Sequence, residues 1–127
     1  MWLREALQNN QAVAIQGDRV MAGPKGVRVP FLGGHVMLPA GPVKLALASG
    51  APIIPIFSIR TASNKVRIFI EQAIVVAPET GDDDPLTPAL QKLAGVLEKF
   101  VRAYPEQWLV LEKAFCEDWS GTSEANA

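Results

Sequence analysis

The first third of the chain combines short apolar blocks with a long stretch rich in glycine and proline. Apolar residues fall at helical spacing on one side of residues 2–9, which predicts a short amphipathic helix. Residues 12–15 form a continuous apolar run before Gly17, a pattern typical of a strand buried on both faces of a parallel sheet. Glycine and proline are frequent from Gly17 to Gly41, so we expect a long loop in which only residues 27–31 are briefly extended.

The middle of the chain predicts a buried helix followed by a β-hairpin. The apolar stretch 43–48 lies between Pro42 and Gly50, residue types that favour the first turn and the end of a helix. Residues 53–59 form another apolar run, and alternating positions mark residues 66–75 as a longer strand. Because turn-forming residues separate these two segments, we expect them to pair as an antiparallel hairpin.

The last third contains the clearest predicted element, an amphipathic helix. Thr87 is the expected N-cap, Pro88 the first helical residue, and Pro105 ends the helix. The apolar stripe of this helix comprises Leu90, Leu93, Ala94, Leu97, Phe100, Val101 and Tyr104. The acidic residues 82–84 are more typical of a solvated turn that favours the helix N-terminus than of a cation site. A last apolar cluster follows, formed by Trp108, Leu109, Leu111 and Phe115.

The order of these elements predicts an α/β fold with a mixed, largely parallel sheet flanked by helices. The chain has 127 residues, which is enough for about one domain. We place that domain at residues 1–119, and we expect the small polar residues of 120–127 to form a disordered tail.

Composition narrows the classes of function. Twelve Lys and Arg against 13 Asp and Glu give a net charge of −1, so the basic excess that attracts nucleic acid is missing. A single cysteine, Cys116, favours neither an intrachain disulfide nor a metal cluster. The longest apolar run, residues 51–59, is well short of the roughly 20 residues of a membrane-spanning helix. The N-terminus also lacks the pattern of a signal peptide, so we expect a soluble or peripheral chain.

Common catalytic pairs are not apparent along the chain. His35 is the only histidine, and no carboxylate lies within four residues of it. It is therefore either an ordinary loop residue or a base oriented by a distant carboxylate such as Asp18. No serine has the Gly-x-Ser-x-Gly setting of a hydrolase nucleophile. Cys116 lies among apolar and aromatic residues, which is typical of an inert thiol.

A charged site is predicted directly after the first buried strand. Ligands of open α/β sheets bind beyond the carboxyl ends of strands, and Gly17 would let the backbone approach a bound group. Arg19 offers a planar cation suited to phosphate or carboxylate, and Lys25 and Arg28 add positive charge. The alternative is that Asp18 and Arg19 satisfy each other or cap the loop.

Taken together, several segments resemble the C-terminal half of the lipid A biosynthesis (lauroyl/myristoyl) acyltransferases, within the lysophospholipid acyltransferase superfamily. The resemblance covers roughly residues 3–116 and rests on the order in which the matching segments follow one another. The segments are Gly17-Asp18-Arg19, residues 23–33, residues 41–46, residues 50–57, Arg60, and the Pro-Glu-Gln-Trp of residues 105–108.

This resemblance implies an enzyme that transfers a fatty acyl group to a hydroxyl of a lipid A precursor or lysophospholipid. The donor would be a thioester of acyl carrier protein or coenzyme A, and no metal or other cofactor is implied. Its base would be the histidine of a His-x4-Asp or His-x4-Glu motif. We expect that motif to lie upstream of Gly17 and outside this chain, because the fifth residue after His35 is Ala40. No catalytic residue is therefore assigned here, and we expect the chain alone to be inactive.

The resemblance also implies the positions that bind substrate. Gly17, Asp18 and Arg19 match the segment beside the acceptor's phosphate or sugar, with Arg19 as the anion contact and Asp18 fixing the loop. Gly23, Lys25 and Arg28 belong to the loop that follows. Residues 53–57 and 43–47 could line an acyl-chain groove, although core packing is the more usual role of such segments.

The expected location is the cytoplasmic face of the inner membrane, reached through the parent protein. The alternative is a short lipid- or anion-binding module, or a module that dimerises through its apolar surface. In either case an incomplete sheet leaves an unpaired strand edge and bare apolar faces, so we expect self-association.

Overall fold

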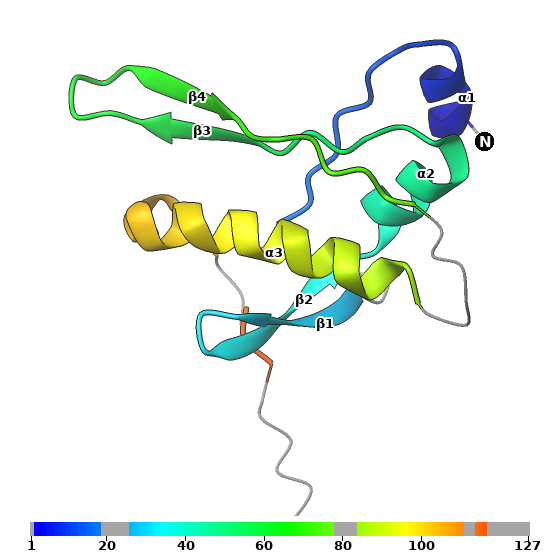
Figure 1. Ribbon diagram of the computed structural model, residues 1–127. Helices are drawn as coiled ribbons and strands as arrows, with labels where there is room; N and C mark the ends of the chain where they lie inside the picture. The colour runs from blue at the N-terminus through cyan, green and yellow to red at the C-terminus, as the bar shows by residue number, and fades with distance from the viewer. Residues whose placement is uncertain (1, 19–25, 78–83, 111–113, 117–127) are drawn as a thin grey trace, which may run out of the picture.

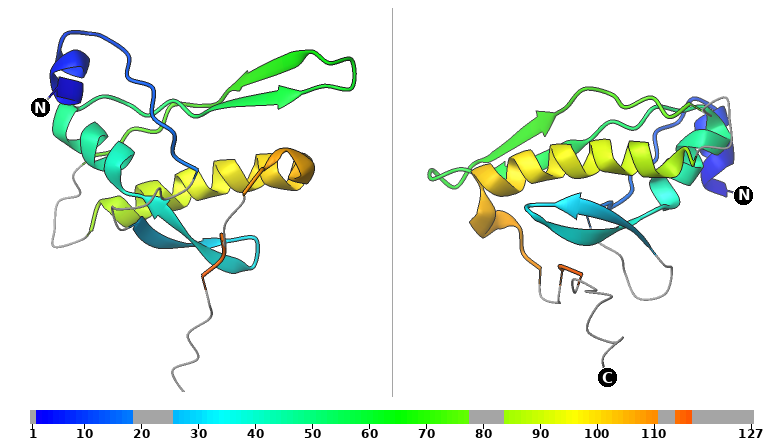
Figure 2. Two further views of the ribbon diagram at one scale, coloured as in Figure 1. Left: turned by 180° about the vertical axis from the view of Figure 1, so that it is seen from behind. Right: turned by 60° about the horizontal axis from the view of Figure 1, so that its bottom comes forward.

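The long helix α3 (Leu86–Ala103) lies between two β-hairpins, as three views of the computed structural model show (Figures 1 and 2). The structure describes residues 2–18, 26–77, 84–110 and 114–116. The other elements are α1 (Trp2–Gln8), β1 (Gly26–Phe31), β2 (Gly34–Pro39), α2 (Gly41–Ser49), β3 (Ile56–Arg60), β4 (Val66–Ile70) and the 3-10 turn η1 (Pro105–Gln107).

The amphipathic stripe predicted for α3 is confirmed. Its buried residues are Ala89, Leu90, Ala94, Leu97, Phe100 and Val101. The start of the helix differs from the expectation, because Asp84 rather than Thr87 satisfies its first turn. The carboxylate of Asp84 accepts the Leu86 N–H at 2.9 Å and the Thr87 hydroxyl. The hydrogen bond from Thr87, followed by that from Leu86, lowers the pKa of Asp84 below its ordinary value of 3.8.

The hairpin β1–β2 corrects the expectation of a long loop up to Gly41. The two strands pair antiparallel with Val29 opposite Val36. Leu32 and Gly33 connect them with φ angles of 50° and 79°, and two positive φ angles are typical of the tight turn that joins twisted strands. One face of the hairpin supplies much of the core, with Val29, Phe31, Val36 and Leu38 each at most 4% exposed.

Helix α2 confirms the prediction for the middle of the chain. Pro42 lies in its first turn, and Gly50 ends it with a left-handed φ of 74°. The Gly50 N–H donates to the carbonyl of Ala46 at 2.8 Å, which satisfies one of the last carbonyls of the helix. Helix α1 likewise confirms the predicted N-terminal helix, one residue shorter than expected.

The antiparallel hairpin predicted for residues 53–59 and 66–75 is also confirmed, although its regular strands are shorter. In β3–β4, Phe57 pairs with Phe69. An isolated bridge between Ile53 and Ile74 continues the pairing beyond the strands. Phe57 and Phe69 both pack on Phe100 of α3, with ring centroids 4.0 and 5.2 Å from it.

The expectation of a largely parallel sheet is wrong for the part of the chain that the structure describes. Both sheets are antiparallel and have two strands each. Residues 12–15, expected to be a buried strand, are extended but unpaired, and the side chain of Ile15 is 46% exposed. The physical reason is that no neighbouring strand lies in hydrogen-bonding contact with this segment among the described residues.

Two further predictions concern the C-terminal tail with the domain bounds, and membrane-spanning helices. The tail 120–127 lies outside the described residues, and the placement of the domain at 1–119 stays a prediction. No described helix combines the length and the apolar composition needed to cross a bilayer.

Candidate functional site

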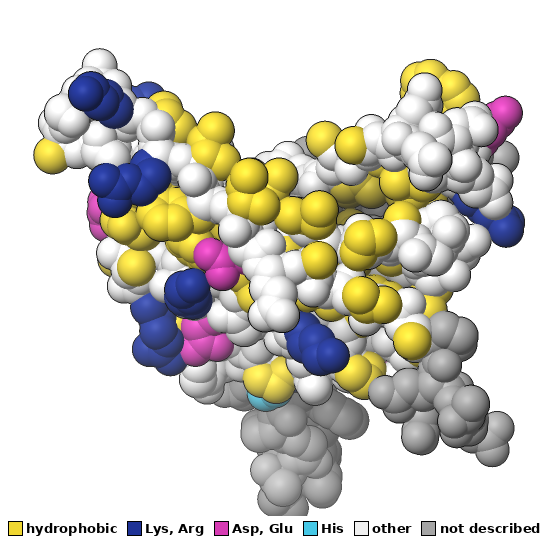
Figure 3. Space-filling model, turned by 45° about the horizontal axis from the view of Figure 1, so that its top comes forward, with side chains coloured by type: hydrophobic (Ala, Val, Ile, Leu, Met, Phe, Trp, Pro, Cys, Tyr) yellow, Lys and Arg dark blue, Asp and Glu magenta, His cyan; other side chains and the backbone are white. Residues whose placement is uncertain are grey.

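A deep apolar cleft separates the extended segment 11–18 from the segment 51–59 that leads into β3. Its volume is about 1250 Å³, above the roughly 300–1000 Å³ of common small-molecule pockets. Figure 3 shows the hollow between the β3–β4 arm and the α1–α2 end of the molecule, with hydrophobic side chains gathered in it. Asp18 is the one charged residue among the described residues that line the cleft.

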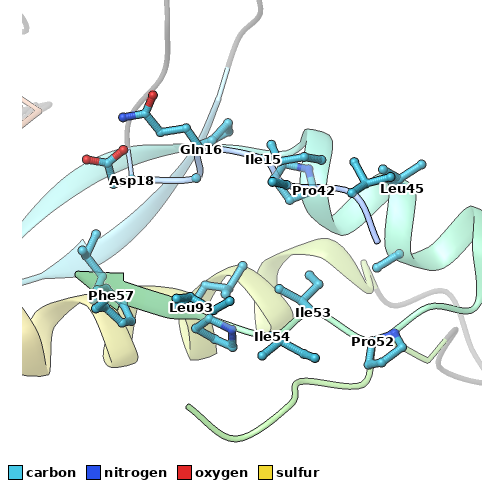
Figure 4. A pocket seen from close by; sticks show the side chains of 18 of the residues that line it. Ile15, Gln16, Asp18, Pro42, Leu45, Pro52, Ile53, Ile54, Phe57 and Leu93 are labelled. Carbon is cyan, nitrogen blue, oxygen red and sulfur yellow. The ribbon is translucent and has the colours of Figure 1, made fainter. Parts of the chain in front are cut away.

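The two walls of the cleft run in the same direction (Figure 4). One wall leads from Ile15 through Gln16 to Asp18, and the other leads from Pro52 through Ile54 to Phe57. Asp18 therefore lies at the carboxyl end of the first segment, opposite Phe57 near the start of β3. The segment that ends at Asp18 is not part of a sheet among the described residues, so its role as a ligand site stays a prediction.

The inner surface of the cleft comes from α2 and α3. Leu45 of α2 and Leu93, Leu97 and Phe100 of α3 line it. The apolar residues of α2 are divided between two roles, because Val43 is fully buried in the core while Leu45 is partly exposed to the cleft.

The predicted binding residues do not all lie at the cleft. Gly17 and Asp18 line it, and nothing lies within 4 Å of the position that a Cβ of Gly17 would take. Arg28 lies on β1 and is not among the lining residues, and its guanidinium contacts His35. Arg19, Gly23 and Lys25 lie outside the described residues, so their roles stay predictions.

His35 has a cation as its neighbour. The Arg28 guanidinium lies 3.3 Å from its Nδ1, and arginine has no acceptor, so Nδ1 must accept this hydrogen bond. The ring proton of the neutral imidazole is then on Nε2. A histidine base oriented by a carboxylate has the opposite arrangement, with Nδ1 donating to the acid. The contact therefore supports the interpretation of His35 as an ordinary structural residue, located on β2 rather than in a loop.

Cys116 is partly buried, and its backbone N–H donates to the carbonyl of His35 at 2.8 Å. Its neighbour Phe115 packs on Phe31 with centroids 6.1 Å apart. These contacts attach the end of the described chain to the β1–β2 hairpin. Among the described residues, no group of three His, Cys, Asp or Glu is placed to hold a metal ion.

The structure also gives a role to the Pro-Glu-Gln-Trp segment, which sequence reasoning did not select as part of the site. The Gln107 side chain accepts the Arg60 N–H at 2.8 Å and donates to the Arg60 carbonyl at 2.8 Å. The side-chain amide thereby makes the two hydrogen bonds that a neighbouring strand would make with the backbone of Arg60 at the end of β3. Trp108 follows and packs on Phe31, with ring centroids 5.4 Å apart. No local sequence signal marks the contact with Arg60, because its partners are 47 residues apart.

Comparisons with known proteins show which sequences this chain resembles. The sequence profile of the bacterial lipid A biosynthesis acyltransferases matches residues 2–117. A phosphatidylinositol mannoside acyltransferase of Mycolicibacterium smegmatis is 28% identical over 124 residues, which are 97% of this chain and 38% of that protein. One from Mycobacterium tuberculosis is 29% identical over 126 residues, 97% of this chain and 37% of that protein.

The chain thus spans less than two fifths of the length of these curated relatives. The profile match, by contrast, extends over nearly all of the chain, from α1 through the cleft and both hairpins to Phe115. The chain therefore belongs to the bacterial lipid A biosynthesis acyltransferase family.

Proposed function

We propose that this chain is the acceptor-binding part of a lipid acyltransferase. The reaction esterifies a hydroxyl of a phosphorylated lipid or glycolipid with a fatty acyl group from an acyl carrier protein or coenzyme A thioester. The hydroxyl oxygen attacks the thioester carbonyl carbon, the C–S bond breaks, and the hydroxyl proton passes through a base to the departing sulfur. The two mycobacterial relatives are named for a phosphoinositide glycolipid, which favours an acceptor of that class.

The observation that carries this proposal is the position of Asp18. Among the described residues that line the apolar cleft, it is the charged one, and it ends the extended segment 11–18 opposite Phe57. The family match of residues 2–117 includes this position. Arg19 follows it in the sequence and supplies the cation for the acceptor's phosphate. Asp18 holds this segment in place and does not transfer the proton.

We also propose that the chain does not turn over by itself. His35 is its one histidine, and the Nδ1 of that ring accepts a hydrogen bond from Arg28. The base of the reaction then lies in another part of the parent enzyme. That enzyme acts at the cytoplasmic face of the inner membrane.

Vesicle binding tests the acceptor site. We expect the chain to bind phosphatidylcholine vesicles that contain phosphatidylinositol mannoside more tightly than phosphatidylcholine alone. Arg19→Ala should weaken that binding about tenfold, the loss expected for one charge-assisted phosphate contact. Arg67→Ala is the matched control, because Arg67 is an exposed cation on β4 outside the cleft. Equal affinities of the wild type and Arg19→Ala would remove the headgroup assignment.

An acyl-transfer assay tests the missing base. The chain is incubated with palmitoyl coenzyme A and phosphatidylinositol mannoside, and release of the coenzyme A thiol is measured. We expect no release above the uncatalysed rate. Turnover by the chain alone that disappears in His35→Ala would overturn the proposal that the base lies elsewhere.

A further inference from the structure

The wall of the cleft formed by residues 54–58 is the open edge of a β-strand. Ile53 exchanges both backbone hydrogen bonds with Ile74, at 2.9 and 2.8 Å. In an antiparallel pair the next residue directs its N–H and C=O to the opposite side, so those of Ile54 point away from the hairpin. The cleft is on that side, since Ile54 lines it.

The same alternation continues along β3. The Thr61 N–H donates to the Lys65 carbonyl at 2.8 Å, and β3 pairs with β4 so that Phe57 lies opposite Phe69. The odd-numbered residues of β3 therefore form the hydrogen bonds to β4. The backbone groups of Ile56 and Ser58 therefore also point to the cleft, and both residues line it. Their edge ends at Arg60, where the Gln107 amide occupies both backbone groups.

The opposite wall has the same property. Residues 12–17 are extended and make no backbone hydrogen bond with other described residues. Exposed apolar side chains follow both walls, with Ile15 46%, Ile54 52% and Ile56 58% exposed. A fatty acyl chain would cover these side chains, but it has no donor or acceptor for the N–H and C=O groups beside them.

From these observations we propose that the cleft receives an extended segment of polypeptide, which adds as a strand between residues 12–17 and the open edge of β3. Strand addition satisfies both rows of backbone groups and covers the apolar side chains at the same time. The sheet would then continue across the cleft, and residues 12–15 would become the buried strand that their sequence predicts.

The occupant is a segment of the remaining polypeptide of the acyltransferase. The match to the mycobacterial relatives covers 97% of this chain but only 37–38% of each relative. More than half of their polypeptide is therefore available to cover such a cleft. The choice of this occupant rests on one part of the proposed function, namely that the chain is part of a larger acyltransferase.

Peptide binding tests the proposal. The probes are overlapping synthetic peptides that cover the part of the Mycolicibacterium smegmatis relative outside the matched stretch, each slightly longer than the five residues of β3. We expect one region of that sequence to bind. Binding should slow amide hydrogen exchange at Ile54, Ile56 and Ser58 at least about tenfold, because these N–H groups become hydrogen-bonded.

Two proline variants locate the binding edge. Ser58→Pro removes a backbone N–H that faces the cleft, while Ile68→Pro, opposite it in the register, removes one on the outer edge of β4. Peptide binding should weaken at least about fivefold in Ser58→Pro and stay within about twofold of the wild type in Ile68→Pro. If Ser58→Pro does not fold, exchange in the wild type with saturating peptide decides the question.

Three results would overturn the proposal. The first is that none of the peptides binds, and the second is that the two proline variants lose binding equally. The third is that Ile54 and Ser58 are already protected in the chain alone and become exposed on dilution, which would assign the edge to a second copy. Vesicle binding that depends on Arg19 is measured separately, so the headgroup site and the strand site can fail independently.

Discussion

The two hairpins of this molecule, β1–β2 and β3–β4, differ in what covers their apolar side chains. In β1–β2 the apolar face lies in the core, where Val29 is fully buried and Leu38 is 1% exposed. In β3–β4 one face packs on α3 through Phe57, but the other carries Val66, Ile68 and Ile70 at 62–71% exposure. The first hairpin is covered within the chain, whereas the second has large apolar side chains that no other described element covers.

This difference separates a part of the chain that buries its own apolar side chains from a part that leaves them exposed. The core cluster joins β1–β2 to α2 and α3 and includes Val43 and Leu90. The β3 edge and the outer face of β3–β4 have the pattern of a sheet interior without its neighbours. We attribute their exposed apolar side chains to burial by the additional polypeptide proposed above.

We expect the largest difference between the two hairpins when one large apolar side chain in each is replaced by alanine. Leu38→Ala removes a side chain that is 1% exposed and should lower the free energy of unfolding by about 2–5 kcal/mol. Ile70→Ala removes one that is 71% exposed and should cost less than about 1 kcal/mol. Urea denaturation measures both values. Similar losses for the two variants would show that the outer face of β3–β4 is covered after all.

A smaller effect is expected where the edge of β3 is closed from within the chain. Gln107→Ala removes the two hydrogen bonds to Arg60 and should lower the free energy of unfolding by about 1 kcal/mol. Gln107→Glu is the conservative control, because a carboxylate still accepts the Arg60 N–H but cannot donate to its carbonyl. Thermal unfolding should place this variant between the wild type and Gln107→Ala. If the stability of both variants equals that of the wild type, the hydrogen bonds of Gln107 do not stabilise the end of β3.

The smallest effect concerns the start of α3, the helix that both hairpins share. The folded-state pKa of Asp84 is lowered by its bonds with Thr87 and Leu86, so its contribution to stability is present above the ordinary value of 3.8. That contribution is lost as the pH falls through the lowered folded-state pKa. The difference in melting temperature between wild type and Asp84→Ala should therefore shrink below pH 3.8. A difference that stays constant from pH 7 to strongly acidic solution would contradict the capping role.

Much of the fold follows from patterns that are local in the sequence. Helices α2 and α3 were predictable from periodicity and from Pro42, Gly50 and Pro105, which act within one turn of the chain. The β1–β2 hairpin was missed because glycine and proline suggested a loop, although Val27, Val29 and Phe31 alternate as strand residues do. Its turn places Leu32, an unusual residue for a positive φ, at 50°.

The segment 12–15 shows the opposite error. Its apolar run predicts a strand buried on both faces, but the burial it indicates depends on neighbours that the described residues do not supply. At the candidate site, the rule that ligands bind beyond strand ends selected Asp18, which lines the cleft although the segment before it is unpaired. Its binding role stays a prediction. The role of Gln107 could not be predicted, because a contact across 47 residues leaves no local pattern.

Residue-resolved amide hydrogen exchange of the chain alone shows whether the edge of β3 that faces the cleft is open. The N–H groups of Phe57 and Ile59 bond to β4, while those of Ile54, Ile56 and Ser58 face the cleft. We expect exchange at least about tenfold slower at Phe57 and Ile59 than at those three residues. Equal protection of all five amides in a monomeric sample would contradict it.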